Sequence, residues 1–339
     1  MIQSSRVSFL SLKDTNVLKG FSLILLLIHH LFSRNTGNFN DISIAGHDIV
    51  TTIAQLSNIC VAIFVLLSGY GLTRKYESNR EESLGHFYKG RYAKLLINFW
   101  FIWILFISVE LLMGGRSFVD VYHDHIIGRA VLDFLGLSYL FGFYGYNPTW
   151  WFMSLIIILY ALYPFLYQFA KKDVSLLLLV TATISLLPFD FVGNMHCYLF
   201  VFCCGVYMAI YGNKKYDRKL LMGGVLFVTI IIGIVDRKCF SANHIFYDGL
   251  VAVALVMLYQ QSRLLKVVSI PLEFMGKHSM NIFLFHTFIF YYWLKEFIYS
   301  PRNSFLIFCL LMGVCLIISV VLEKVKQWIG IDQLVSKLK

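Results

Sequence analysis

Apolar residues fill long stretches of this chain from residue 19 to residue 322, and charged residues gather in the short segments between them. The stretches run for roughly 16 to 24 residues, which is the length that an α-helix needs to cross the hydrocarbon core of a bilayer. The pattern therefore predicts an all-α fold, a polytopic transmembrane helical bundle. We place ten spans at about 19–33, 49–72, 95–113, 148–169, 174–190, 196–211, 220–235, 245–260, 277–295 and 304–322.

The segments outside these spans are short, with one exception. The long connection 114–147 contains an apolar part that is rich in glycine and aromatic residues, which suits an interfacial or re-entrant element better than an eleventh span. Asp14 or Thr15 is placed to cap the first helix. Only a short amphipathic tail follows Glu323, so we expect a single integral-membrane domain over residues 1–339.

The distribution of positive charge predicts the orientation of the bundle. If the N-terminus is cytoplasmic, 22 of the 29 Lys and Arg residues fall in cytoplasmic segments and 7 fall in outer segments. Cytoplasmic loops of membrane proteins carry an excess of Lys and Arg, so both termini and the basic loop 73–94 are predicted to be cytoplasmic. The same rule explains the net charge of +10 without a nucleic-acid partner.

Composition excludes a soluble domain and gives no sign of a metal site. The chain is 58% hydrophobic and its mean hydropathy is +0.71, which is typical of a protein whose solvent is the lipid bilayer. The trio His123-Asp124-His125 lacks a further well-placed ligand, so we expect no metal there. The seven cysteines lie mostly inside apolar runs and are expected to fill the core; they are Cys60, Cys197, Cys203, Cys204, Cys239, Cys309 and Cys315.

The first apolar stretch carries a cation at its start and two histidines near its end. Lys19 and His30 are 11 residues apart, which on a helix leaves them about 20° apart on one face and about 16.5 Å apart along the axis. If Lys19 lies at a membrane surface, His30 lies near the midplane. A long anionic molecule held at Lys19 would then present its other end to His30.

A second intramembrane histidine is predicted at a similar depth. His286 follows Lys277 by nine residues, or about 13.5 Å along a helix. Histidines inside a bilayer are rare and usually face a cavity or a partner, so His30 and His286 are predicted to share one site. His29 points about 100° away from His30, so we expect it to contact another helix.

Other polar residues sit at the ends of the predicted spans. Arg91 and Lys94 are three residues apart on one helical face, where they suit a phosphate group, although positive-inside anchoring also explains them. Asp248 and Glu110 are the acids placed deepest in the spans near the outer side. Each is expected either to orient a histidine or to meet water in an outward cavity.

Five short motifs follow one another along most of the chain. They are Leu18-Lys19-Gly20 through His30-Leu31-Phe32, Phe64-Val-Leu-Leu-Ser-Gly-Tyr70, Phe87 to Leu96, Trp150-Trp-Phe-Met-Ser-Leu155 through Tyr160 and Pro164, and Leu272-Glu-Phe-Met-Gly-Lys-His-Ser279 to Leu284-Phe-His286. Together they resemble the motifs of the integral-membrane acyltransferase 3 family. The family's first arginine is Lys19 here, and Ile97-Asn98 stands where a proline often follows the Arg-x-x-Arg segment.

The resemblance implies an O-acyltransferase of the bacterial plasma membrane. It would move an acyl group, usually acetyl from acetyl-CoA, to a hydroxyl of a cell-envelope glycan or lipid-linked saccharide. His30 and His286 are the expected catalytic residues, with His30 as general base or as the carrier of a transient acyl-imidazole. Lys19, Arg91 and Lys94 would hold the phosphates of CoA at the cytoplasmic face.

The acceptor side is assigned less directly. Asp248, Glu110 and Trp151 are expected among the residues that bind the acceptor. There is no Gly-x-Ser-x-Gly elbow, and Ser68 before Gly69 is expected to shape a helix break instead.

The alternative function is a transporter or flippase for an envelope saccharide. Release of CoA thiol from acetyl-CoA in the presence of a glycan would separate the two functions.

Overall fold

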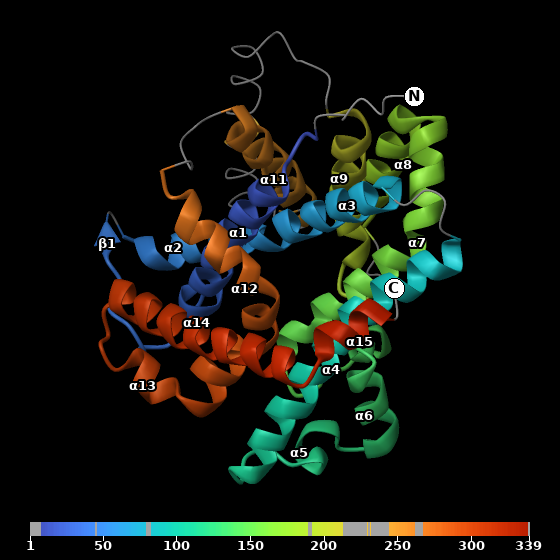
Figure 1. Ribbon diagram of the computed structural model, residues 1–339. Coiled ribbons are helices and arrows are strands. Elements are labelled where there is room, and N and C mark those ends of the chain that lie inside the picture. Colours follow the sequence, from blue (N-terminus) through green and yellow to red (C-terminus); the bar gives the residue numbers. More distant parts are fainter. Residues whose placement is uncertain are drawn as a thin grey trace. The chain divides into compact units, whose positions relative to one another are not determined.

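The computed structural model of this chain describes residues 8–44, 46–78, 83–188, 192–212, 244–261 and 267–337, together with Thr229 and Ile231. Figure 1 shows that these residues form helices almost throughout, with one small hairpin. The contacts divide the chain into two compact units. Unit 1 comprises Met1–Thr36, Asp41–Asn79 and Ala161–Lys277, and unit 2 comprises Gly37–Asn40, Arg80–Tyr160 and His278–Lys339. Each unit is described by itself.

Unit 1 is built on α3 and the helices that pack around it. Its elements are α1 (Leu12–Phe32), β1 (Ser43–Ile44), β2 (His47–Asp48), α2 (Ile49–Leu56), the 3₁₀ helix η1 (Ser57–Ile59), α3 (Cys60–Ser78), α8 (Val174–Leu186), the 3₁₀ helix η4 (Met195–Tyr198), α9 (Leu199–Tyr211) and α11 (His244–Gln261). The strands β1 and β2 pair antiparallel. α7 (Trp151–Lys172) contributes its part from Ala161 onward, and α12 (Ser269–Thr287) its part up to Lys277.

Unit 2 contains the remaining parts of α7 and α12 and the long helix α4. Besides the parts of α7 and α12, its elements are α4 (Leu84–Leu112), α5 (Phe118–Tyr122), α6 (Ile126–Phe134), the 3₁₀ helices η2 (Ser138–Phe141) and η3 (Pro148–Trp150), the π-helix η7 (Phe288–Trp293), α13 (Lys295–Tyr299), α14 (Ser304–Trp328) and α15 (Ile331–Lys337).

Five helical segments among the described residues are long and apolar enough to cross a membrane. They are Leu12–Phe32, Ile49–Ser78, Leu84–Leu112, Pro148–Lys172 and Ser304–Trp328. Helices also occupy most of the described residues in the predicted spans at 174–190, 196–211, 245–260 and 277–295. The predicted span 220–235 lies outside the described residues except for Thr229 and Ile231. The all-α, multi-pass architecture is therefore confirmed, while the number of ten spans and the cytoplasmic termini stay predictions.

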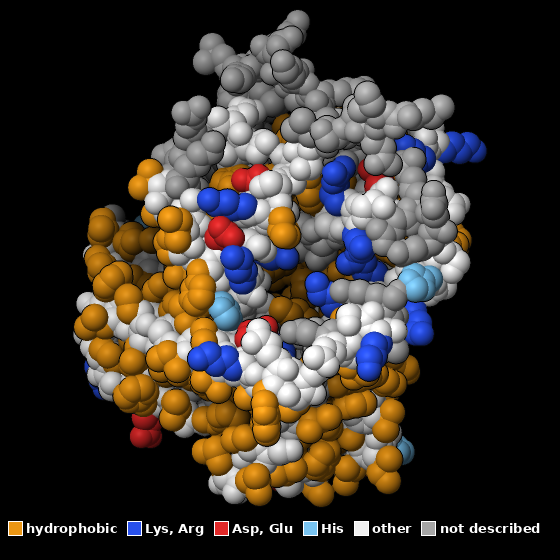
Figure 2. Space-filling model, viewed as in Figure 1, with side chains coloured by type: hydrophobic (Ala, Val, Ile, Leu, Met, Phe, Trp, Pro, Cys, Tyr) orange, Lys and Arg blue, Asp and Glu red, His pale blue; other side chains and the backbone are white. Residues whose placement is uncertain are grey.

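The surface of the protein agrees with a bilayer as its solvent. Figure 2 shows hydrophobic side chains over much of the visible face. Leu112, Ile127 and Phe305 are 87%, 82% and 71% exposed. Large apolar side chains in such number on helix surfaces would aggregate in water, so hydrocarbon is the environment they fit.

α1 begins seven residues before the predicted span, because polar residues cap it. The side-chain oxygen of Ser11 accepts a hydrogen bond from the backbone N–H of Asp14 at 3.1 Å, and the Asp14 carboxylate accepts one from the backbone N–H of Ser11 at 2.8 Å. This reciprocal pair is a capping box. The N-cap residue is thus Ser11, not the predicted Asp14 or Thr15, and Asp14 takes part in the cap as the partner of Ser11.

Glycines let α3 and α9 approach until their backbones touch. A Cβ atom at Gly69 would lie 2.3 Å from the carbonyl oxygen of Phe202, and one at Gly205 would lie 2.1 Å from that of Leu66. Helices in membranes pack closely where small residues meet in this way. α3 runs without interruption through Ser68 and Gly69, so the expected helix break there is wrong and Gly69 serves close packing instead.

The connection 114–147 forms short helices around one buried carboxylate. α6 has 9 residues, about 13.5 Å of helix, which is too short to cross a bilayer and agrees with the prediction of a non-spanning element. Asp133 is 0% exposed and accepts hydrogen bonds from the Tyr122 hydroxyl at 2.8 Å and the Trp103 indole at 3.1 Å. Burial raises the pKa of Asp133, and these hydrogen bonds oppose that rise.

Candidate active site

α1 holds Lys19 and His30 on one continuous α-helix within unit 1. Both side chains are half-buried, and the helix runs without a break from Leu12 to Phe32. The 20° offset that the sequence predicts for the pair therefore applies. Because the helix starts at Leu12, Lys19 lies about 10.5 Å inside it and His30 only two residues from its end. The midplane depth of His30 depends on Lys19 lying at a membrane surface and stays a prediction.

His29 contacts another helix, as the sequence predicts. Its Nδ1 atom lies 2.9 Å from the backbone carbonyl oxygen of Ala54 on α2. A carbonyl oxygen only accepts, so Nδ1 of His29 carries the hydrogen. This bond links α1 to α2 and gives His29 a structural role.

Asp248 lies in the first part of α11, also within unit 1. It is 5% exposed. The neighbouring Gly249 brings α11 close to α9, since a Cβ atom there would lie 3.1 Å from the Cβ atom of Val201. Tight packing of α11 thus keeps the Asp248 carboxylate inside unit 1, and its role toward a substrate or a histidine stays a prediction.

His286 is fully enclosed near the end of the α-helical part of α12, within unit 2. Its Nδ1 atom lies 2.9 Å from the carbonyl oxygen of Ile282 and 3.1 Å from that of Phe283. Because both partners only accept, Nδ1 carries the hydrogen and the lone pair of the neutral ring is on Nε2. The ring also stacks on Phe290, with centroids 5.9 Å apart and planes 15° apart. Nε2 is thus the atom of His286 suited to accept a proton.

Two side chains hold the helix beside His286. The amide nitrogen of Asn147 and the indole nitrogen of Trp150 donate to the carbonyl oxygen of Leu284, at 2.9 Å and 2.8 Å. Asn147 and Trp150 are each 1% exposed. The sequence prediction missed both residues as supports of His286, because no pattern along the chain relates η3 to a carbonyl 134 residues later.

The predicted donor residues of unit 2 lie near the start of α4. The Arg91 guanidinium is 5.8 Å from the centre of the Phe87 ring, and Lys94 is exposed. The carbonyl oxygen of Lys94 accepts a hydrogen bond of 2.7 Å from Asn98. Arg91 and Lys94 are therefore brought together by one helix, with Asn98 one turn further along it.

Asn98 leads to a buried lysine that the sequence prediction treated as part of a cytoplasmic tail. Lys326 on α14 is 2% exposed, and its ammonium group donates to Asn98 at 2.9 Å, to Asn281 at 2.6 Å and to Glu323 at 3.1 Å. Asn281 also donates to Ser319 at 3.1 Å. The sequence does carry a signal for this polar cluster, because Ser319, Glu323 and Lys326 recur at helical spacing on one face of an apolar helix.

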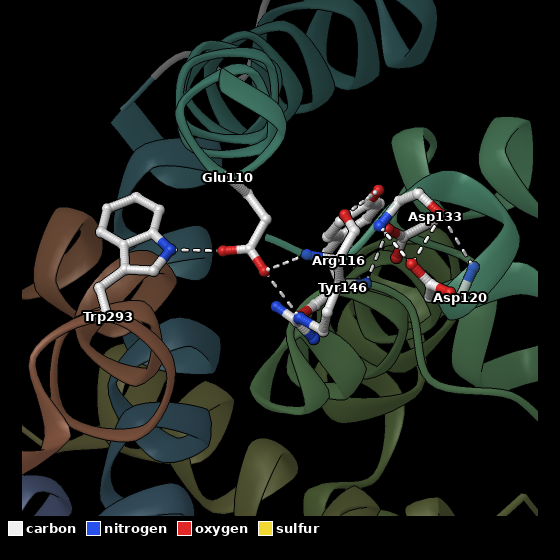
Figure 3. Close-up of polar contacts among 7 residues, drawn as sticks. Glu110, Arg116, Asp120, Asp133, Tyr146 and Trp293 are labelled. Carbon is white, nitrogen blue, oxygen red and sulfur yellow. Dashed lines mark hydrogen bonds and ion pairs between the residues drawn. The ribbon is translucent and has the colours of Figure 1, made fainter. Parts of the chain in front are cut away.

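Glu110 is occupied by contacts to the connection 114–147 of unit 2 and to η7. Figure 3 shows its carboxylate between Trp293 and Arg116. The Arg116 side chain donates to Glu110 at 2.8 Å, and the Trp293 indole donates to the other carboxylate oxygen. The Arg116 guanidinium also lies 3.5 Å from the centre of the Tyr292 ring. These contacts join α4, the connection 114–147 and η7. The predicted binding of a substrate by Glu110 stays a prediction.

Trp151 opens α7 at the edge of unit 2. Its ring is half-buried and lies 6.0 Å from that of Tyr139 and 6.2 Å from that of Phe152. Among the described residues, no group of three or more His, Cys, Asp or Glu side chains could hold a metal ion.

Five of the six cysteines that the structure describes are core residues. Cys60, Cys197, Cys203, Cys204 and Cys315 are buried free thiols and Cys309 is an exposed one, whereas Cys239 lies outside the described residues.

The predicted site residues thus fall into two groups. Lys19, His30 and Asp248 belong to unit 1; Arg91, Lys94, Glu110, Trp151 and His286 belong to unit 2. Within each group the helices place the residues as described above. His30 and His286 belong to different units, and their sharing of one site stays a prediction.

One comparison with known proteins gives a match. A family model described as an acyltransferase domain matches residues 12–324, which is nearly the whole chain and includes parts of both units. No curated protein and no solved structure matches.

Proposed function

Because this chain belongs to the acyltransferase 3 family, we propose that it moves an acetyl or similar acyl group from cytoplasmic acetyl-CoA to a hydroxyl of an extracytoplasmic saccharide. The family match supports a membrane acyltransferase with an acceptor substrate. The donor, the glycan nature of the acceptor and the bacterial cell membrane as its location are our proposal. The family match gives no support to the alternative, a saccharide transporter or flippase.

The observation that carries the proposal is the continuous helix α1, with Lys19 and His30 three turns apart on one face. CoA has its phosphates at one end and its thioester at the other. A donor whose phosphates meet the Lys19 ammonium extends along α1 toward the imidazole of His30. Fixing a reactant at both ends in this way lowers the entropic cost of reaching the transition state.

His30 is the general base in the proposed reaction. The acceptor hydroxyl gives its proton to a ring nitrogen of His30 while its oxygen attacks the carbonyl carbon of the thioester. The carbon–sulfur bond then breaks, and CoA leaves as a thiolate that takes the proton from the imidazolium to become the thiol. The products are the saccharide ester and free CoA, and His30 returns to its neutral form.

His286 is the second catalytic residue of the proposal. Its Nδ1–H is committed to the carbonyl oxygens of Ile282 and Phe283, which presents Nε2 as a proton acceptor of fixed orientation. The alternative chemistry makes a histidine the nucleophile, with a transient acyl-imidazole that the acceptor hydroxyl then resolves.

Arg91 and Lys94 complete the donor end of the proposal. They lie three residues apart on one face of α4, where two cations can jointly bind a phosphate group. Lys94 is an exposed residue, which suits a ligand that would arrive from the cytoplasm. Each charge-assisted hydrogen bond to phosphate contributes about 1.5 to 3 kcal/mol before screening.

The test uses the protein in lipid nanodiscs with acetyl-CoA and a panel of envelope oligosaccharides. We expect release of CoA thiol that depends on the saccharide, together with an acetyl ester on the sugar. His30→Ala should abolish both products. Saccharide binding or vesicle transport without any thiol release from acetyl-CoA would contradict the proposal and favour the transporter.

A further inference from the structure

Three aromatic side chains form a partly exposed cluster where the outer connection meets α7, within unit 2. The rings of Tyr139 and Tyr144 lie 5.3 Å apart, and those of Tyr139 and Trp151 lie 6.0 Å apart. Tyr144 is 54% exposed, and Tyr139 and Trp151 are half-buried. The accessible rings combine apolar faces with polar edges, since Tyr and Trp each carry a hydrogen-bonding group.

The ring contacts continue inward and end at His286. Trp151 contacts Phe152 at 6.2 Å, Phe152 contacts Phe283 at 4.9 Å, and Phe283 contacts His286 at 6.4 Å. Exposure falls along this series, from the half-buried Trp151 and Phe152 to Phe283 at 6% and His286 at 0%. The six side chains form an aromatic track from the surface of unit 2 to a proposed catalytic residue.

We infer that the outer part of this track, Tyr144, Tyr139 and Trp151, binds the acceptor as a saccharide whose pyranose rings stack on the aromatic faces. A pyranose presents C–H groups on its ring faces and hydroxyls at its edge. Aromatic rings bury the faces without competing for those hydroxyls. Stacking is tolerant of the hydroxyl pattern, so the track favours a chain of sugars over a small polar acceptor.

The track differs from an ordinary belt of interfacial aromatic residues. Such a belt anchors the helices in the headgroup region through Trp and Tyr side chains. Phe141 in η2 is an aromatic residue of the same connection outside the track, with 64% of its surface accessible. A belt requires no contact with the catalytic residue. The series from Tyr144 to His286 instead links the accessible rings to the proposed site of acyl transfer.

This inference rests on the proposed function, because the acceptor is the molecule that acyl transfer modifies. Its test therefore measures binding without an acyl donor. The protein is placed in nanodiscs of phospholipids, which carry no sugar that would compete. Saturation-transfer difference NMR is then recorded with four neutral probes: maltotetraose, cellotetraose, chitotetraose and mannotetraose.

We expect at least one tetrasaccharide to show transfer to its ring C–H protons. Trp151→Leu should weaken that binding about tenfold, as expected for the loss of one stacked ring, while Trp151→Phe should keep most of it. The matched control is Phe141→Leu, which removes an exposed aromatic ring of the same connection outside the track and should bind as the wild type. Tyr139→Leu should weaken binding in the same direction as Trp151→Leu.

The outcomes separate this inference from the proposed function. If no probe binds, or if Trp151→Leu binds as well as Phe141→Leu, the track does not recognise saccharides and the inference is overturned. If Trp151-dependent binding is found but no CoA thiol is released under any condition, acyl transfer is overturned while the saccharide site stands. In the active protein, Trp151→Leu should raise the acceptor KM about tenfold and leave the KM for acetyl-CoA unchanged.

Discussion

Adjacent histidines on α1 have different tasks, and their positions on the helix explain why. His29 points to α2 and bonds to the carbonyl oxygen of Ala54, whereas His30 lies about 100° away on the face of Lys19. The angular argument was available from the sequence alone. The identity of the His29 partner was not, because it depends on how α1 packs against α2.

This difference gives the first prediction. His30→Ala should reduce the rate of acyl transfer by 10² to 10⁴ or more, the usual cost of losing a general base. His29→Ala should cost about 1 kcal/mol of stability, the worth of one hydrogen bond, and leave most of the rate. Rates and thermal midpoints of both purified variants decide the matter. Equal and complete loss of transfer in both would leave the angular argument without support.

The charge at Lys19 gives the second prediction. Lys19→Gln should raise the KM for acetyl-CoA about tenfold to a hundredfold, since one charge-assisted bond to phosphate is lost. Lys19→Arg should retain activity, because a guanidinium also binds phosphate. The matched control is Lys13→Gln, which removes an exposed cation from the first turns of the same helix. A donor KM that is the same in all three variants would mean that the phosphates bind elsewhere.

Lys326 was beyond the sequence prediction, because a lysine near the end of a helix usually reaches water. Its burial follows from partners on α4 and α12, Asn98 and Asn281, which are 228 and 45 residues away. Without the ammonium group, the amide oxygen of the buried Asn281 would lose this donor, and the half-buried Asn98 would lose its bond to α14. Each unsatisfied group costs about 1 to 3 kcal/mol.

The third prediction compares two lysines of α14. Lys326→Met should lower the thermal midpoint by at least several degrees, on the order of 2–4 °C for each kcal/mol lost. Lys324→Met, which changes an exposed lysine two residues earlier, should leave the midpoint within about a degree. Thermal unfolding in one detergent measures both. A stable Lys326→Met variant would show that the buried polar cluster contributes nothing net.

At the scale of helices, the existence of each element was easier to predict than its ends. The apolar pattern locates the part of α1 that is buried in hydrocarbon, but the helix extends through polar residues to the capping box at Ser11 and Asp14. α14 likewise continues beyond its predicted end to Trp328. Hydropathy measures contact with lipid, whereas the caps and hydrogen bonds determine where a helix begins and ends.

The contact of α3 with α9 gives the fourth prediction. Gly69→Ala should destabilise the protein strongly, because the added Cβ would lie 2.3 Å from a backbone oxygen of Phe202 that cannot move aside alone. Gly71→Ala, on the same helix, adds a Cβ with nothing within 4 Å and should be tolerated. The yield of monodisperse protein and its thermal midpoint report the difference. Equal behaviour of the two alanine variants would contradict the close approach.

At the scale of the whole molecule, the multi-pass helical architecture and the family could be predicted from the sequence, since hydropathy and short motifs carry both. The connection 114–147 was also predicted not to span, whereas the bonds of its Asp133 to Tyr122 and to Trp103 of α4 were not predicted. The meeting of residues far apart in sequence, such as Trp150 and Leu284, was not predictable. Those contacts depend on helix packing, which leaves no period in the sequence.

The orientation of the chain is the subject of the fifth prediction. In a cysteine-free background, a cysteine at Ser78 should react with an impermeant maleimide only after the cells are opened, because loop 73–94 is predicted to be cytoplasmic. A cysteine at Asp120 should react in intact cells, because the connection 114–147 is predicted to face outward. The reverse pattern would invert the topology and move the donor residues to the wrong side.

The π-helix after His286 contains one residue more per hydrogen-bonded turn than an α-helix, so this segment could lose a residue and remain helical. In η7 the N–H of Leu294 bonds to the carbonyl oxygen of Ile289, five residues back instead of four. An in-frame loss of one codon here would let the turn close as an α-helix with its backbone bonds still made. Trp293 would then turn by about 100° relative to His286 and lose its bond to Glu110. The loss of one residue here would thus keep the helix intact and remove its link, through Glu110, to the connection 114–147.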